Sequence, residues 1–148
     1  MRSFRALIVL VVAISVRGQP PTDFTGHWRQ QTKSGIQRQL EVEQKGQNLR
    51  VKTVLTSSEG IENLEVKYEI GGPETTYKGL DGDEFRSSVR WDATALVFDT
   101  IEYEAGREIP QKAVWTLSAD GNTLQVEKQW TKSGKAAHSF ATFVRQPN

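Results

Sequence analysis

Apolar and polar residues alternate along most of this chain from Phe24 onward. The run 64–70 (Leu-Glu-Val-Lys-Tyr-Glu-Ile) is the clearest example. A period of two is typical of β-strands with one dry face and one wet face, and no stretch beyond residue 24 has a sustained helical period. The pattern therefore predicts an all-β protein with about ten strands. We place them near residues 24–30, 36–44, 49–56, 63–70, 75–79, 84–91, 94–103, 112–118, 123–131 and 137–145.

Short turns between these runs allow a test of strand register. A slip of one residue would place the apolar sets on opposite faces of the sheet. Five connections, including Asp120-Gly121 and the loop 45–48, instead keep one common apolar face. The residue pairs expected to face each other are Val42 and Val51, Leu40 and Thr53, Tyr68 and Tyr77, Tyr77 and Phe85, Val89 and Leu96, Ser87 and Phe98, Trp115 and Val126, and Leu117 and Leu124.

Nearly every connection between the expected strands is of hairpin length. Such a meander has sheet edges to protect, and closure into a barrel removes them. We therefore expect a single antiparallel up-and-down β-barrel of about eight to ten strands. A β-sandwich is the competing architecture, although it usually needs longer crossover connections.

The first eighteen residues differ from the rest of the chain. Arg2 and Arg5 precede the uncharged apolar stretch 6–16, and Gly18 follows as a small residue at a plausible cleavage site. This order is typical of a secretory signal peptide. As a helix the stretch would span only about 16 Å, against about 30 Å for the hydrocarbon core of a membrane. The sequence predicts a signal peptide at 1–18, a barrel domain at 19–148, and a secreted or periplasmic protein without a membrane span.

Removal of this leader changes the charge balance. The whole chain has 19 basic and 18 acidic residues, and three of the arginines lie in the leader. The exported form is therefore slightly acidic, and it has no basic stripe with interleaved aromatic residues of the kind that nucleic acid requires. The chain contains no cysteine, so its stability must come from its core rather than from disulfides.

The motif Gly26-His27-Trp28 lies on the first expected strand of the exported portion. A Gly-x-Trp entry strand followed by a meander barrel resembles the lipocalin-like branch of the calycins. The resemblance implies that Trp28 closes the floor of the barrel beneath an arginine from near the end of the chain, for which Arg145 is the matching position. The chain departs from lipocalins in having no disulfide and no Thr-Asp-Tyr loop. Fatty-acid-binding proteins have a two-helix lid between their first two strands, where this chain has only residues 31–35.

Several polar residues share the apolar face of the expected strands, so a barrel would enclose them. Arg38, Thr53, Ser87, Thr100, Glu102 and Lys128 belong to this set. Burying a charge requires a partner, so Arg38 and Lys128 are candidates to meet the anionic group of an amphipathic ligand. Alternatively, they extend to water from the strand ends, or Arg38 pairs with Glu102. The candidate ligand-binding residues are Arg38, Lys128, Tyr68, Phe98, Thr100, Glu102 and Trp130.

His138 suggests a second hypothesis. Haem-binding barrels of the nitrobindin type hold iron through one histidine near the C-terminus, and His138 lies on the last expected strand. The register of that strand is open, because each of its faces carries a phenylalanine. Two isolated histidines do not predict a zinc site. No nucleophile elbow, P-loop or dinucleotide turn is present, so we expect no enzyme activity, no metal and no cofactor.

The expected strand 94–103 is apolar on both faces. Val97, Ile101 and Tyr103 would point outward, which favours a homodimer or a protein partner at this patch, unless the loop 104–110 covers it. The sequence thus predicts an exported, non-enzymatic, lipocalin-like barrel that binds a small hydrophobic or amphipathic molecule. The alternative is an interaction or inhibitor module, with a barrel filled by its own side chains and acting through its loops or this patch. The ligand's identity is not predicted.

Overall fold

A computed structural model describes residues 20–148, so the predicted signal peptide lies outside the described residues. This part of the chain is all-β and contains no helix, hence none that could cross a membrane. The ten strands are β1 (Gly26–Gln30), β2 (Gln37–Lys45), β3 (Asn48–Ser57), β4 (Gly60–Glu69), β5 (Thr75–Lys78), β6 (Glu84–Asp92), β7 (Ala95–Glu104), β8 (Arg107–Leu117), β9 (Thr123–Lys132) and β10 (Lys135–Arg145).

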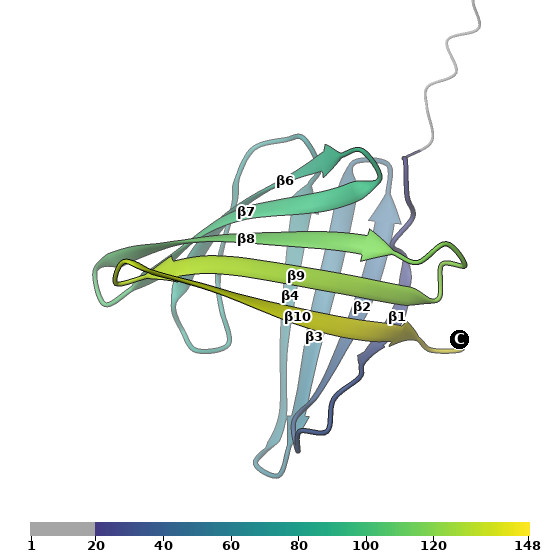
Figure 1. The fold of residues 1–148 in the computed structure, drawn as a ribbon, viewed down its shortest axis with the longest axis horizontal. Coiled ribbons are helices and arrows are strands. Elements are labelled where there is room, and N and C mark those ends of the chain that lie inside the picture. The colour runs from purple at the N-terminus through teal and green to yellow at the C-terminus, as the bar shows by residue number, and fades with distance from the viewer. Residues whose placement is uncertain (1–19) are drawn as a thin grey trace, which may run out of the picture.

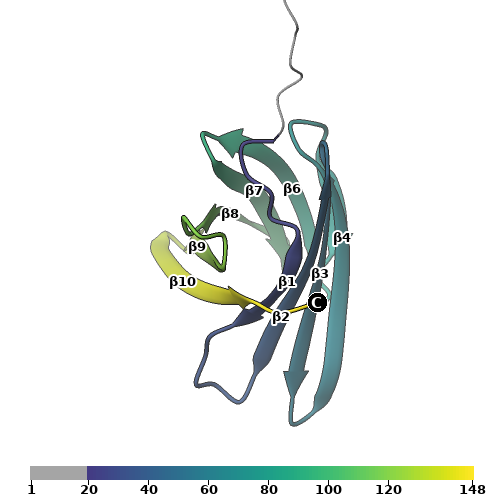
Figure 2. The same ribbon diagram turned by 90° about the vertical axis from the view of Figure 1, so that its right-hand side faces the viewer.

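The strands form one antiparallel sheet that curls into a nearly closed barrel. Their order is β4-β3-β2-β1-β10-β9-β8-β7-β6-β5, so the first strand pairs with the last. In Figure 1, β1 to β4 run steeply behind β7 to β10, which run nearly horizontally, and Figure 2 shows the two groups facing each other. The predicted barrel and the predicted closure between the two ends of the chain are both confirmed.

Most of the predicted pairings are present. Val42 faces Val51, Tyr77 faces Phe85 and Leu117 faces Leu124. The β6–β7 hairpin is one exception, because Val89 pairs with Phe98 instead of Leu96, and Ser87 with Thr100 instead of Phe98. The turn lies at residues 93–94, one residue later than the prediction, with Ala93 at a positive φ of 52°. The resulting shift is two residues, so the same side chains still face inward.

The barrel is not closed by backbone pairing between β4 and β5, which are the two edges of the sheet. The predicted hairpin between them is therefore wrong, although the Tyr68 and Tyr77 rings do meet edge to face at 6.2 Å. The backbone turns away instead: Gly71 N–H donates to the carbonyl of Val89 at 2.7 Å, and Ile70 forms a single bridge to Val89.

The hydrophobic core gathers at the end of the barrel where β1 meets β10. Its most buried large side chains are Trp28, Phe24 and Phe143, each at most 2 % exposed. The sequence predicted that Phe24 lies within the first strand, but β1 begins only at Gly26. Phe24 precedes the strand and packs beneath the barrel. We call this end, with Phe24, Trp28, Trp91 and Trp115, the floor.

Candidate functional site

The floor is closed by the pair that the Gly-x-Trp motif suggested. Trp28 and Arg145 are paired residues of β1 and β10, and the Arg145 guanidinium carbon lies 4.3 Å from the centre of the Trp28 ring. Arg145 also donates hydrogen bonds to the carbonyls of Thr25 at 2.7 Å and Gly121 at 3.0 Å. The guanidinium thus joins the first strand, the last strand and the β8–β9 turn.

Gly26 makes room for this arrangement. A Cβ atom at this position would overlap the nearest nitrogen of the Arg145 guanidinium, and Gly26 has a φ of +156°. The glycine, the tryptophan and the arginine are therefore one packing unit.

Phe24 seals the floor from below. Its ring stacks on Trp91 at 6.2 Å and meets Trp115 edge-on at 6.0 Å. The side chain of Gln44 holds this segment by accepting from Phe24 N–H at 2.9 Å and donating to the carbonyl of Thr22 at 3.0 Å. The sequence analysis missed Gln44, because one glutamine among the polar residues of β2 carries no distinguishing signal.

Aromatic rings continue from the floor into the barrel. Phe98 lies 4.8 Å from Trp115 and 5.4 Å from Tyr68, measured between ring centres. Phe98 is 6 % exposed, and burial raises the pKa of the Tyr68 phenol well above its usual value. Two of the candidate ligand residues, Tyr68 and Phe98, are thus part of a packed stack that bounds the interior from below.

The opposite end of the barrel, which we call the mouth, is open to water. Strand β1 is short and ends at Gln30. Residues 135–141 of β10 therefore pair with β9 on one side and have no paired strand on the other. Inward-facing side chains at this end stay partly or fully accessible, in contrast to those at the floor. They are Arg38, Leu55, Leu64, Lys128, Trp130 and Ser139.

Small side chains lie between the mouth and the aromatic stack. Ala113, Val126 and Ala141 face inward from β8, β9 and β10, pack against the core and remain partly accessible. Val126 pairs with Trp115 and Ala113 with Phe98, so these two residues border the aromatic stack, and Ala141 lies beside them as the partner of Val126. We call these three residues the small-residue shelf.

Charged groups converge beside this shelf. Burial lowers the pKa of Lys128, while nearby Glu102 raises it and nearby Arg38 lowers it. The Lys128 ammonium lies 5.7 Å from the centre of the Trp130 ring. Arg38 is exposed, and among the described residues no ion pair joins it to Glu102. The two cations are therefore not neutralised by a direct carboxylate contact.

A polar row crosses the barrel next to these charges. The hydroxyl of Ser87 lies 2.7 Å from that of Thr100 and 3.3 Å from that of Tyr77. Two residues further along β7, Glu102 accepts a hydrogen bond from the side chain of Gln111. These groups offer donors and acceptors at one side of the interior.

Glu102 also lies close to two carboxylates of the β5–β6 loop that the sequence analysis did not connect with it. Oxygens of Asp81, Asp83 and Glu102 are within 4.8 Å of one another, which is the one grouping among residues 20–148 that could hold a metal ion. Burial raises the pKa of Glu102, the two aspartates raise it further, and Lys128 lowers it.

A pH dependence of stability follows from this raised pKa. A carboxyl group whose pKa is higher in the folded state than its ordinary 4.5 favours the folded state when protonated, so its contribution is lost as the pH rises above that value. We expect Glu102→Gln to match the wild type in melting temperature near pH 4 and to exceed it at pH 7. Thermal melts at both pH values check this, and a less stable variant at pH 7 would contradict it.

His138 does not face the interior. It pairs with Gln129, is exposed, and lies 5.6 Å from the ring of Phe140 on the outer face of β10. The inward residues of β10 are Ala137, Ser139, Ala141, Phe143 and Arg145. The haem hypothesis required an inward imidazole on this strand and is wrong on this point.

The expected outward apolar patch is not a free surface. Val97 is only 2 % exposed, and Ile101 and Tyr103 are partly buried. The Arg86 guanidinium covers the Tyr103 ring at 4.7 Å. Residues 104–110 do not fold over the patch, since β7 and β8 are joined by residues 105–106 alone. Cross-strand neighbours cover the patch, and a homodimer or protein partner at this place is not supported.

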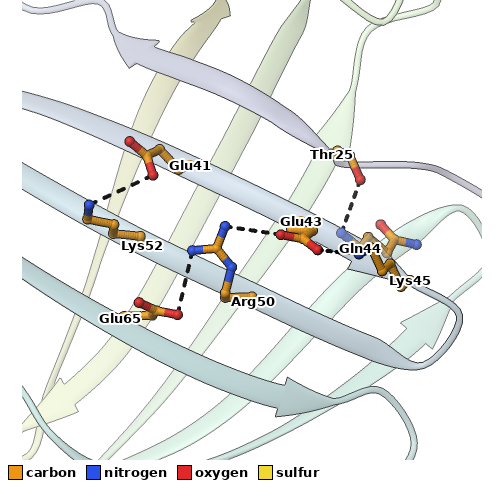
Figure 3. A network of polar contacts seen from close by, with 8 residues as sticks. All are labelled: Thr25, Glu41, Glu43, Gln44, Lys45, Arg50, Lys52 and Glu65. Atoms are coloured by element: carbon orange, nitrogen blue, oxygen red, sulfur yellow. Dashed lines mark hydrogen bonds and ion pairs between the residues drawn. The ribbon is translucent and has the colours of Figure 1, made fainter.

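The outer face of β2, β3 and β4 carries a network of alternating charges (Figure 3). Arg50 pairs with Glu43 at 3.1 Å and Glu65 at 3.5 Å, and Lys52 lies 3.9 Å from Glu41. These charges neutralise one another locally and face away from the interior.

Comparison with known proteins defines the fold. No family model and no curated protein sequence matches the chain. Among solved structures, the fatty acid transporter REP1-NXSQ is similar with a TM-score of 0.65 at 11% identity, over 84% of this chain and 96% of that one. Zebrafish ileal bile acid-binding protein in complex with cholic acid gives 0.60 at 13%, over 83% and 98%. Secretory abundant heat soluble protein 4 from Ramazzottius varieornatus gives 0.60 at 15%, over 88% and 97%. The fold is thus that of a lipocalin-like calycin barrel.

Proposed function

We propose that this protein is an exported, non-enzymatic barrel that binds a small hydrophobic or amphipathic molecule in its interior. The observation that carries the proposal is the change in accessibility along the inner wall. Inward side chains are sealed at the floor and open to water from the small-residue shelf to the mouth. Apolar surface that faces inward but stays wet is the usual lining of a ligand site.

The charges of the interior support an amphipathic ligand. Lys128 is partly buried beside apolar side chains and Arg38 lies near it, so an anionic group placed between them would relieve the cost of desolvating Lys128. Two of the structural neighbours are named for a fatty acid and a bile acid, both of which combine an apolar body with a carboxylate.

Export is part of the proposal. It rests on the leader 1–18, whose basic start, apolar stretch and small residue at the cleavage position are typical of a secretory signal peptide. The intact mass of the protein recovered outside the cytoplasm tests it, and a mass that still includes the leader would contradict cleavage after Gly18.

Titration of a fluorescent fatty acid into the purified protein tests the binding site. We expect Arg38→Ala with Lys128→Ala to raise the Kd about tenfold or more, because charge-assisted contacts contribute about 1.5–3 kcal/mol. The matched control is Arg50→Ala with Lys52→Ala, which removes the same two residue types from the outer face.

Equal affinities for the two double variants would exclude the interior cations from the site. Failure of any fatty acid or bile acid to bind the wild type would favour the alternative of a filled barrel that acts through its loops.

A further inference from the structure

Lys128 is the one lysine among residues 20–148 that lies partly buried on the inner wall of the barrel. The other lysine that is not exposed, Lys52, faces outward and lies 3.9 Å from Glu41. No carboxylate in this part of the chain forms an ion pair with Lys128. Its amine is thus accessible from the mouth and has no direct partner that would hold it in the charged form.

Charged groups from three other elements lie near Lys128. They are Arg38 of β2, Glu102 of β7 and Asp81 of the β5–β6 loop. Burial has the largest effect and lowers the pKa of Lys128, Arg38 lowers it as well, and the two carboxylates raise it. Because only the neutral amine is a nucleophile, burial and Arg38 both increase the reactive fraction of Lys128 at neutral pH.

The pairing of this amine with Arg38 suits attack on a carbonyl group. The guanidinium keeps its proton at neutral pH, so it stays a cation near the amine. A cation at this place stabilises the negative charge that develops on a carbonyl oxygen when an amine attacks the carbon. The two side chains therefore combine a nucleophile with an electrostatic stabiliser, and the open mouth gives access to them without an enclosed cavity.

We propose that Lys128 binds an aldehyde covalently as a Schiff base, with Arg38 stabilising the carbonyl oxygen during the attack. The amine nitrogen forms a bond to the carbonyl carbon, and a proton passes from nitrogen to oxygen to give a carbinolamine. The C–O bond then breaks, the hydroxyl leaves as water with a proton from the solvent, and the nitrogen lone pair completes the C=N bond. The products are one iminium ion and one water molecule. The reaction consumes the amine, so it is capture rather than catalysis.

This inference goes beyond the proposed function, because the bond is covalent and the ligand needs no carboxylate. Reductive alkylation of the purified protein with benzaldehyde and sodium cyanoborohydride tests it. The hydride converts each Schiff base to a stable benzylamine, and peptide mass spectrometry gives the initial rate at each lysine. We expect Lys128 to react about tenfold or more faster than Lys112, which is exposed on the outer face of β8.

Arg38→Ala should slow the modification of Lys128 at pH 7 and move its rate–pH profile to higher pH, because a cation that lowers the pKa of Lys128 is lost. Arg38→Lys keeps the charge and should retain most of the wild-type rate. Arg50→Ala is the matched control, because it removes an arginine from the outer face, and it should leave the rate at Lys128 unchanged.

A wild-type rate at Lys128 no higher than that at Lys112 would overturn the inference, and the fatty acid titration has no bearing on this comparison. Equal rates at Lys128 in Arg38→Ala and Arg50→Ala would overturn the role of Arg38.

Discussion

Trp28→Ala is expected to lower the free energy of unfolding by about 3–5 kcal/mol, a large share of the roughly 5–15 kcal/mol that stabilises a typical domain. The indole is 1 % exposed, stacks under Arg145 and donates a hydrogen bond to the carbonyl of Phe24 at 3.0 Å. Its removal leaves a cavity at the place where the first and last strands meet. Urea denaturation followed by circular dichroism measures the change.

Trp130→Ala is the matched control for this prediction. Trp130 also faces inward, but it lies at the mouth and is partly accessible. Its loss removes less buried surface, and we expect a cost below about 1 kcal/mol. Equal costs for the two tryptophans would show that the floor does not hold the barrel together in the way that its packing indicates.

Phe24→Ala is expected to cost a similar 3–5 kcal/mol, although Phe24 belongs to no strand. The side chain is completely buried and its ring contacts both Trp91 and Trp115, so its removal leaves a cavity beneath the floor. The same urea experiment measures the effect. Phe140→Ala, which removes a ring that is 67 % exposed on β10, should change stability by less than about 0.5 kcal/mol.

A wild-type urea midpoint for Phe24→Ala would contradict this prediction. It would mean that residues 20–25 detach from the barrel without affecting the strands.

Alternation was enough to predict the ten strands and the inner face of most of them, but not that of β10. A hairpin keeps one apolar face only if its register shifts by an even number of residues. The positions of the turns at Gly46 and Gly121 then determine which of these registers forms. The β6–β7 turn escaped this reasoning because Ala93 adopts a left-handed conformation that glycine or asparagine normally signals.

Contacts between distant segments were harder to predict. Nothing in residues 70–74 shows that the chain leaves β4 to bond with Val89, so the open seam between β4 and β5 was missed. The register of β10 was undecided because Phe140 and Phe143 lie on opposite faces, and its pairing with β9 and with β1 fixes it. Asp81 and Asp83 lie in the β5–β6 loop, and no local sequence pattern predicts that this loop brings them close to Glu102.

Proximity of a bound ligand to the small-residue shelf tests the central claim most directly. We would measure intermolecular NOEs between octanoate and the methyl groups of the isotopically labelled protein. Contacts with Ala113, Val126 and Ala141 are the predicted result. Contacts confined to outward methyl groups such as that of Ala136, with none to the shelf, would contradict an interior site.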